Sequence, residues 1–115
     1  MDVISEFSKL EGISEDEEKA LRILWENKIT KLNPLELKPI ETVEGEKLKL
    51  FVYRNGIAAV LHKQTGLFIL IYGVNAVELE SLRYIVTKEK DQDHQFVSLV
   101  YEYLNAKEKG RLGKI

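Results

Sequence analysis

The chain has 115 residues, 44% of them hydrophobic and 31% charged, which is the size and composition of a single folded domain. It contains no cysteine, and this excludes disulfides, thiolate metal sites and cysteine nucleophiles. The net charge of −2 argues against broad attraction to nucleic acid or anionic lipid. No apolar run approaches the roughly 20 residues that span a bilayer, and the N-terminus lacks the apolar core of a signal peptide. We therefore expect a cytoplasmic protein without membrane association, and the Lys- and Glu-rich composition is typical of heat-adapted proteins.

Two short helices are predicted in the N-terminal third. Apolar side chains at helical spacing in residues 2–10, followed by Gly12, predict the first. Ser14 and Glu17 form a capping box, in which each side chain accepts a hydrogen bond from the other residue's backbone amide. The capping box predicts a second helix over residues 15–27.

Residues 47–73 contain three apolar runs separated by two glycine-containing turns, the pattern of an antiparallel meander. Before them, Pro34 and Pro39 exclude a long helix or a central strand and leave room for a short edge strand near residues 40–43. The sequence therefore predicts a three- to four-stranded antiparallel meander over about residues 40–73.

The turn residues predict which side chains share a face of this sheet. Asn55 and Gly56 suit a two-residue type I′ turn, and residues 64–66 suit a three-residue loop that Gly66 closes. Because side chains alternate along a strand, one predicted face carries Phe51, Tyr53, Val60, His62, Phe68, Leu70 and Tyr72. The opposite predicted face carries Leu48, Leu50, Val52, Ile57, Ala59, Leu61, Leu67, Ile69 and Ile71. A second loop of only two residues would invert the last strand and change this assignment.

Two further helices are predicted after the meander. Asn75 caps the first, with Glu78 at the third helical position. The predicted buried side of this helix consists of Val77, Leu79, Leu82, Ile85 and Val86. The second helix, over about residues 93–109, is apolar around most of its circumference, so we expect it to be buried or to pair with another surface. The whole chain, residues 1–115, is thus predicted to be one α+β domain with the order α-α-β-β-β-β-α-α.

No motif for catalysis or for a cofactor stands out. His62 and His94 are the only histidines and do not form an HxxxH or HExxH pattern. There is no GxSxG sequence, and the seven glycines are scattered rather than gathered in a phosphate-binding loop. The E-x-K spacing of Glu36 and Lys38 is weak evidence for a nuclease in a chain so rich in Lys and Glu. We therefore expect a protein that is not an enzyme and that has no catalytic, cofactor or metal site.

Two functional hypotheses follow, and the acidic net charge favours the first. In the first, the chain is a small non-catalytic interaction module, a homo-oligomer that contacts a protein partner, with Tyr101 or Tyr103 in the oligomer interface. The contact surface would be either the last helix or the predicted sheet face that carries Phe51, Tyr53, His62, Phe68 and Tyr72. In the alternative, it binds single-stranded nucleic acid. Bases would then stack on Phe51, Tyr53, His62, Phe68 and Tyr72. The phosphate backbone would contact Lys49, Arg54 and Lys63. If helices cover these rings instead, the rings belong to the core, with Trp25 and the tyrosines of the last helix as natural covers.

Overall fold

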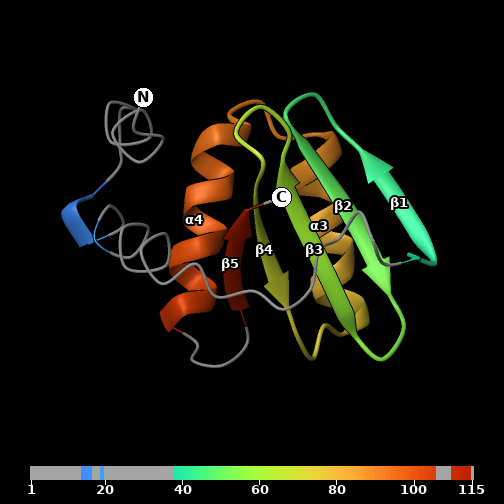
Figure 1. Cartoon of the computed structure of the whole chain (residues 1–115). Coiled ribbons are helices and arrows are strands. Elements are labelled where there is room, and N and C mark those ends of the chain that lie inside the picture. Colours follow the sequence, from blue (N-terminus) through green and yellow to red (C-terminus); the bar gives the residue numbers. More distant parts are fainter. Residues whose placement is uncertain (1–13, 17–18, 20–37, 106–109, 115) are drawn as a thin grey trace.

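The computed structural model describes residues 14–16, 19, 38–105 and 110–114 (Figure 1). In this part of the chain the elements are, in order, β1 (Glu41–Glu44), β2 (Leu48–Tyr53), β3 (Ile57–His62), β4 (Leu67–Ile71), α3 (Ala76–Thr87), α4 (Gln92–Asn105) and β5 (Gly110–Lys114). The strands form one antiparallel sheet with the spatial order β1-β2-β3-β4-β5. Both helices lie behind the sheet in the view of Figure 1, so the fold is a two-layer α+β arrangement.

The predicted order of elements is wrong, because a fifth strand follows the last helix. Helix α4 ends at Asn105, and the chain returns to the sheet as β5, which pairs along the whole of β4. All five residues of β4 are buried and apolar, and an unpaired edge of this kind is prone to aggregation. Pairing with β5 removes that edge. The two predicted N-terminal helices, over residues 2–10 and 15–27, fall almost wholly outside the described residues, and no N-terminal helix is among the elements of the described part.

Both loops of the meander are one residue longer than predicted. Tyr53 lies opposite Ile57, so the first loop has three residues. Asn55 and Gly56 nevertheless have the expected positive φ angles, 66° and 71°. The second loop, residues 63–66, has four residues instead of three. The predicted register is therefore wrong at both turns.

Each extra loop residue moves the side chains of the following strand to the opposite face of the sheet. Two such changes separate β2 from β4, so the predicted facing of β4 relative to β2 is unchanged. The aromatic residues of these two strands therefore share a face, as predicted, whereas β3 is inverted. Val60 and His62 lie on the opposite face from Phe51, because Phe51 is opposite Ala59 and Leu50 is opposite Val60. We use the term aromatic face for the side of the sheet that carries Phe51, Tyr53, Ile57, Ala59, Leu61, Phe68, Leu70 and Tyr72.

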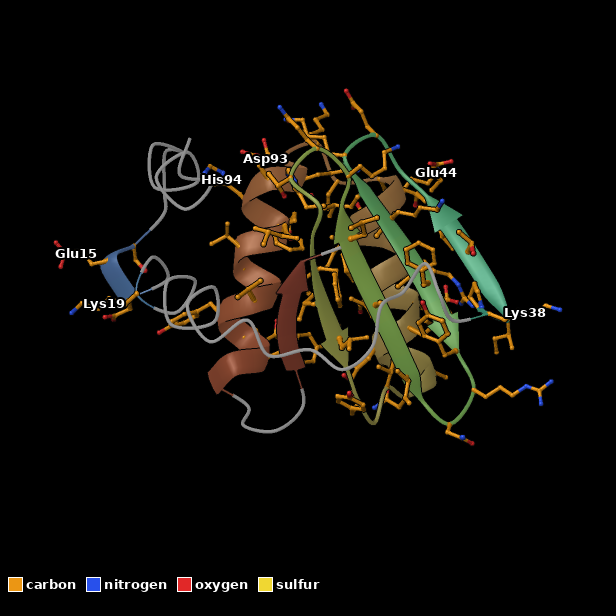
Figure 2. All side chains as sticks on the ribbon, in the orientation of Figure 1. Glu15, Lys19, Lys38, Glu44, Asp93 and His94 are labelled. Carbon is orange, nitrogen blue, oxygen red and sulfur yellow. The ribbon has the colours of Figure 1, made fainter. Side chains whose placement is uncertain are left out.

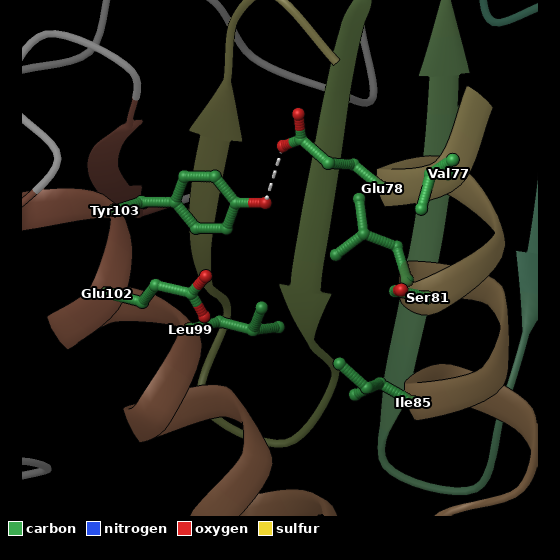
Figure 3. Close-up of a pocket in the computed structure, with 8 residues that line it drawn as sticks. Val77, Glu78, Ser81, Ile85, Leu99, Glu102 and Tyr103 are labelled. Atoms are coloured by element: carbon green, nitrogen blue, oxygen red, sulfur yellow. Dashed lines mark hydrogen bonds between the residues drawn. The ribbon is translucent and has the colours of Figure 1, made fainter. Parts of the chain in front are cut away.

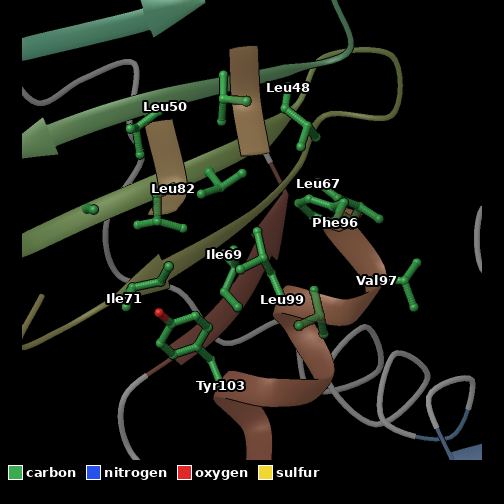
Figure 4. Close-up of a cluster of buried hydrophobic side chains, with 14 of the residues drawn as sticks. Leu48, Leu50, Leu67, Ile69, Ile71, Leu82, Phe96, Val97, Leu99 and Tyr103 are labelled. Atoms are coloured by element: carbon green, nitrogen blue, oxygen red, sulfur yellow. The ribbon is translucent and has the colours of Figure 1, made fainter. Parts of the chain in front are cut away.

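The main core lies between the other face of the sheet and the two helices (Figure 4). Helix α3 packs against β1 and β2, while α4 packs against β5 and β3. The largest fully buried side chains in this core are Leu48, Leu50, Leu67, Ile69, Ile71, Leu82 and Phe96. Burying a side chain of this size contributes roughly 1.5–3 kcal/mol, so this layer dominates the stability of the described part of the chain.

Two polar contacts stabilise α3, one at its beginning and one with the edge strand of the sheet. Asn75 caps the helix as predicted, because its side chain accepts a hydrogen bond from the Glu78 amide at 2.8 Å. Arg83 donates two hydrogen bonds to the carboxylate of Glu41 in β1, from Nε to Oε2 at 2.8 Å and from Nη2 to Oε1 at 2.7 Å. This is the bidentate geometry of a strong ion pair. This hydrogen-bonded contact lowers the pKa of the Glu41 carboxyl, even though burial opposes the change. Val77, however, is 76% exposed, so its assignment to the buried side of the helix is wrong.

The aromatic face is also buried, although both described helices lie on the opposite side of the sheet. Phe51 is 4% exposed and Phe68 1% exposed. Burial raises the pKa of Tyr53 to about 12, which agrees with a ring shielded from water. Trp25, the expected cover, lies outside the described residues. The rings of this face are thus core side chains in this structure.

Candidate functional site

A groove of about 320 Å³ separates α3 from α4 (Figure 3). Among the described residues it is lined by Val77, Glu78, Ser81, Leu82, Ile85, Leu99, Glu102 and Tyr103. On each helix these positions recur at three- and four-residue steps, which places them on one side of that helix. The groove is therefore formed by the facing surfaces of two helices, and no described loop residue lines it.

The position of the two helices on the sheet accounts for the groove. Helix α3 leans toward the β1 edge and α4 toward the β5 edge. The short connection over residues 88–91 holds them together at one end only. The lining residues come from the first three turns of α3 and the last two turns of α4, so the groove opens at the end away from this connection.

The floor of the groove is apolar and its walls carry two carboxylates. Leu82 and Leu99 belong to the buried core, while the exposed Val77 stands at the rim. Glu78 projects from α3 and Glu102 from α4 (Figure 3). None of the described lining residues carries a positive charge. The groove therefore combines apolar surface with negative potential.

One of the two carboxylates is held in place from across the groove. The Tyr103 hydroxyl of α4 donates a hydrogen bond to Oε2 of Glu78 on α3, at 3.1 Å. Burial, and then the hydrogen bond to Glu78, raise the pKa of the Tyr103 hydroxyl, so it remains a neutral donor. The Glu78 amide is bound by the Asn75 cap. The cap thus holds the backbone of Glu78, and Tyr103 holds one oxygen of its carboxylate. The other carboxylate oxygen does not take part in this hydrogen bond and can accept one from a partner.

A second polar cluster lies at the beginning of α4, around Asp93 (Figure 2). His62 Nε2 is 2.7 Å from Oδ1 of Asp93, and His62 Nδ1 is 2.8 Å from the Thr65 hydroxyl. Lys47 Nζ donates to Oδ2 of Asp93 at 2.7 Å. Burial raises the pKa of the Asp93 carboxyl, but the hydrogen bonds from His62 and Lys47 outweigh it and lower the pKa overall.

Thr65, His62 and Asp93 place a hydroxyl, an imidazole and a carboxylate in the order found in a hydrolytic triad, but their contacts are structural. We use the term clamp for these three residues together with Lys47. His62 is only 2% exposed. The Thr65 hydroxyl also accepts a hydrogen bond from the Leu67 amide at 3.3 Å, and the Thr65 amide lies 3.4 Å from His62 Nδ1. Both groups of Thr65 therefore hold the β3–β4 turn. The clamp ties that turn, and the β1–β2 turn through Lys47, to the beginning of α4.

The buried side chain of Gln92 adds further hydrogen bonds between the sheet and the two helices. Its side-chain oxygen accepts hydrogen bonds from the backbone amides of Lys47 at 2.7 Å and Leu48 at 3.1 Å. Its side-chain nitrogen donates to the carbonyl oxygen of Val86 at 2.7 Å. One buried amide group thus joins the beginning of β2, the end of α3 and the beginning of α4.

The structure brings together only part of the predicted nucleic-acid site. Phe51, Tyr53, Phe68 and Tyr72 share the aromatic face, and the Lys49 ammonium lies 5.3 Å from the centre of the Phe51 ring. The other candidates are elsewhere. His62 belongs to the clamp on the opposite face, Arg54 lies in the β2–β3 loop, and Lys63 lies at the other end of β3, where it donates to the Gly45 carbonyl oxygen at 2.9 Å. Because the four rings are buried or half-buried, this arrangement offers no open platform for bases.

The two candidate interface tyrosines have different surroundings. Tyr101 is half-buried, whereas Tyr103 is 7% exposed and forms a wall of the groove. The sequence reasoning missed the groove itself. The spacing of Val77 in the sequence could have indicated an exposed apolar residue. Leu79, Leu82 and Val86 follow one another at three- and four-residue steps, and Val77 does not fit these steps, so it lies on another side of the helix.

Comparison of the chain with protein-family models, with curated proteins and with solved structures finds no match. Among the described residues, no group of three or more His, Cys, Asp or Glu side chains is arranged to hold a metal ion. Neither described helix has the length and apolar character needed to cross a membrane. The groove and the clamp are therefore interpreted from their own geometry.

Proposed function

We propose that this chain is a small non-catalytic interaction module that binds a protein partner in the groove between α3 and α4. The observation that supports this proposal is the combination of an apolar floor with an exposed apolar rim residue, Val77, in a cavity formed by two packed helices. An exposed apolar surface rimmed by polar groups is typical of a protein-binding site. The polar cluster that most resembles a catalytic group is used as a clamp, which favours a binding role over an enzymatic one.

We also propose that the chain self-associates, through a surface other than the groove. Tyr101 of α4 is half-buried and lies outside the groove lining, so a contact between copies through Tyr101 would leave the groove open to a partner. Tyrosine is favoured in such contacts because it joins an apolar ring to a polar hydroxyl. Sedimentation at tens of micromolar is expected to show a dimer or a larger assembly, and Tyr101→Ala should shift it toward the monomer. A monomer for the unmodified chain would remove this part of the proposal.

Site-specific photo-cross-linking tests the groove directly. A benzoylphenylalanine in place of Val77 should give a discrete cross-linked product in the cells that make this protein. The same group in place of Gln64, which is exposed in the β3–β4 loop away from both the groove and Tyr101, serves as the matched control and should give none. Equal products from both positions, or none from either, would refute the groove as the interaction surface.

The nucleic-acid alternative is tested by titrating single-stranded DNA and RNA at low salt. Because the aromatic face is buried and the net charge is −2, we expect no binding. Salt-sensitive binding that is weakened by Phe51→Ala would instead restore the alternative.

A further inference from the structure

The chemistry of the groove defines the kind of partner that it fits, if the groove is the binding surface proposed above. Its two walls are helices, its floor is apolar, and each helix contributes one carboxylate, Glu78 from α3 and Glu102 from α4. No described lining residue is positively charged to neutralise them. A neutral apolar segment would therefore desolvate these carboxylates with only the Tyr103 hydroxyl to compensate, which is unfavourable. A segment with positive charges beside its apolar side chains avoids this penalty.

The hydrogen-bonding capacity of the groove favours a helix over an extended peptide. Apart from the two carboxylates and the tyrosine hydroxyl, which already binds Glu78, the Ser81 hydroxyl is the only polar side-chain group among the described lining residues. An extended peptide would bury backbone N–H and C=O groups with too few partners, whereas a helix satisfies its own backbone groups. Helix-in-groove binding also matches the three- and four-residue spacing of the lining positions on both walls.

The charges also exclude a second copy of the same surface as the occupant. In a symmetric contact between two grooves, Glu78 and Glu102 of one copy would face the same carboxylates of the other. Such like-charge contacts oppose association. The occupant must therefore present charge of the opposite sign.

We propose that the groove binds an amphipathic helix of a partner protein, with one or two apolar side chains on the floor and Arg or Lys side chains paired with Glu78 and Glu102. The Tyr103 hydroxyl holds one oxygen of Glu78 before the partner arrives, so the carboxylate is oriented in advance and loses less freedom on binding. Charge selects the partner, and the apolar floor supplies most of the buried surface.

Model peptides test this proposal with the intact protein. The probe is a fluorescent helical peptide with Leu at four-residue spacing and Lys and Arg beside each Leu. One control has the same composition in a scrambled order that destroys the apolar stripe, and another has Glu in place of each Lys and Arg. Fluorescence anisotropy should detect binding of the first peptide alone. Equal binding of the scrambled peptide would show general attraction to an acidic protein, and equal binding of the Glu peptide would show that charge does not select the partner; either result overturns the proposal.

Variants of the protein locate the binding. Glu78→Gln and Glu102→Gln should each weaken binding of the cationic peptide about fivefold and reduce its dependence on salt. Glu46→Gln removes the same charge from an exposed turn away from the groove and should leave the affinity unchanged. If all three variants behave alike, the peptide does not bind between the helices. Cross-linking from position 77 without binding of the cationic helix would overturn this proposal and leave the interaction function standing, whereas failure of both would remove both.

Discussion

Replacing Gln92 by Leu should destabilise the protein more than any other single polar-to-apolar change in the described core. Leu is close to Gln in size, so the replacement fills the same space and leaves no large cavity. It removes the side-chain amide that accepts from the Lys47 and Leu48 amides and donates to the Val86 carbonyl oxygen. The effect therefore measures the hydrogen bonds themselves.

The expected magnitude follows from which partners stay buried. The hydrogen bonds to the Leu48 amide and the Val86 carbonyl are buried, while the Lys47 amide is partly buried and can turn to water. A buried group left without a partner costs about 1–3 kcal/mol, so two such groups cost about 4 kcal/mol. Burial of the Leu side chain offsets about 1.5 kcal/mol. The net loss in the free energy of unfolding should be about 2.5 kcal/mol, or roughly 10 °C in Tm for a domain of this size.

Urea unfolding followed by circular dichroism measures this loss, and an unchanged m value shows that the two states being compared are the same. Amide hydrogen exchange adds a local test, because the Leu48 amide should lose protection ahead of its neighbours in β2. Gln64→Leu, at an exposed position of the β3–β4 loop, is the matched control and should change stability by less than about 0.5 kcal/mol. A Gln92→Leu variant within about 0.5 kcal/mol of the unmodified protein would refute the idea that this amide joins the three elements.

Three further predictions concern the turns and the clamp. Gly45→Ala should cost about 3 kcal/mol in urea unfolding, because the added Cβ would overlap the Val86 carbonyl oxygen, whereas Gly73→Ala has open space and should lose only about 1 kcal/mol to its φ of 69°; equal losses would contradict the close contact. Gly56→Val should cost about 2 kcal/mol, since a β-branched residue resists a φ of 71°, and an unchanged melting temperature would show that the loop does not require this angle. The folded-state pKa of Asp93 lies below the ordinary value of 3.8, so its stabilising contribution is complete above that pH and is lost as the pH falls through the lower folded value. The stability difference between Asp93→Asn and the unmodified protein should therefore be largest near pH 6 and shrink below pH 4, and a constant difference in urea unfolding between pH 3 and pH 6 would disprove the clamp.

The turn residues illustrate how far the sequence could specify the sheet. Asn55 and Gly56 adopt positive φ as their chemistry requires, but they do so in a three-residue loop as readily as in a two-residue one. The length of the loop is set by contacts distant in sequence, including the hydrogen bond from the Val74 amide to the Gly56 carbonyl oxygen at 2.8 Å. Local propensity therefore located the turn, and tertiary contacts decided the register.

Strand β5 could not be predicted for a related reason. Residues 110–114 contain two glycines, and glycine weakens a strand that must stand on its own. The strand exists because β4 is apolar throughout and needs a partner along its second edge, which is a property of β4 and not of the segment that pairs with it. The Asn75 cap, by contrast, depends only on residues within one turn of the helix, and it was predicted correctly.

The clamp and the groove are two consequences of one arrangement of the helices. Near the connection between α3 and α4, Gln92 and Asp93 bind the β1–β2 turn, the β3–β4 turn and the end of α3. One turn before Val86, Arg83 binds Glu41 and holds α3 over the β1 edge, while α4 packs against β5. The clamp therefore joins both helices to the sheet at the end near their connection, and the groove lies between the first turns of α3 and the last turns of α4. The hydrogen bond from Tyr103 to Glu78 crosses this groove, so the Glu78 carboxylate is positioned before any partner binds.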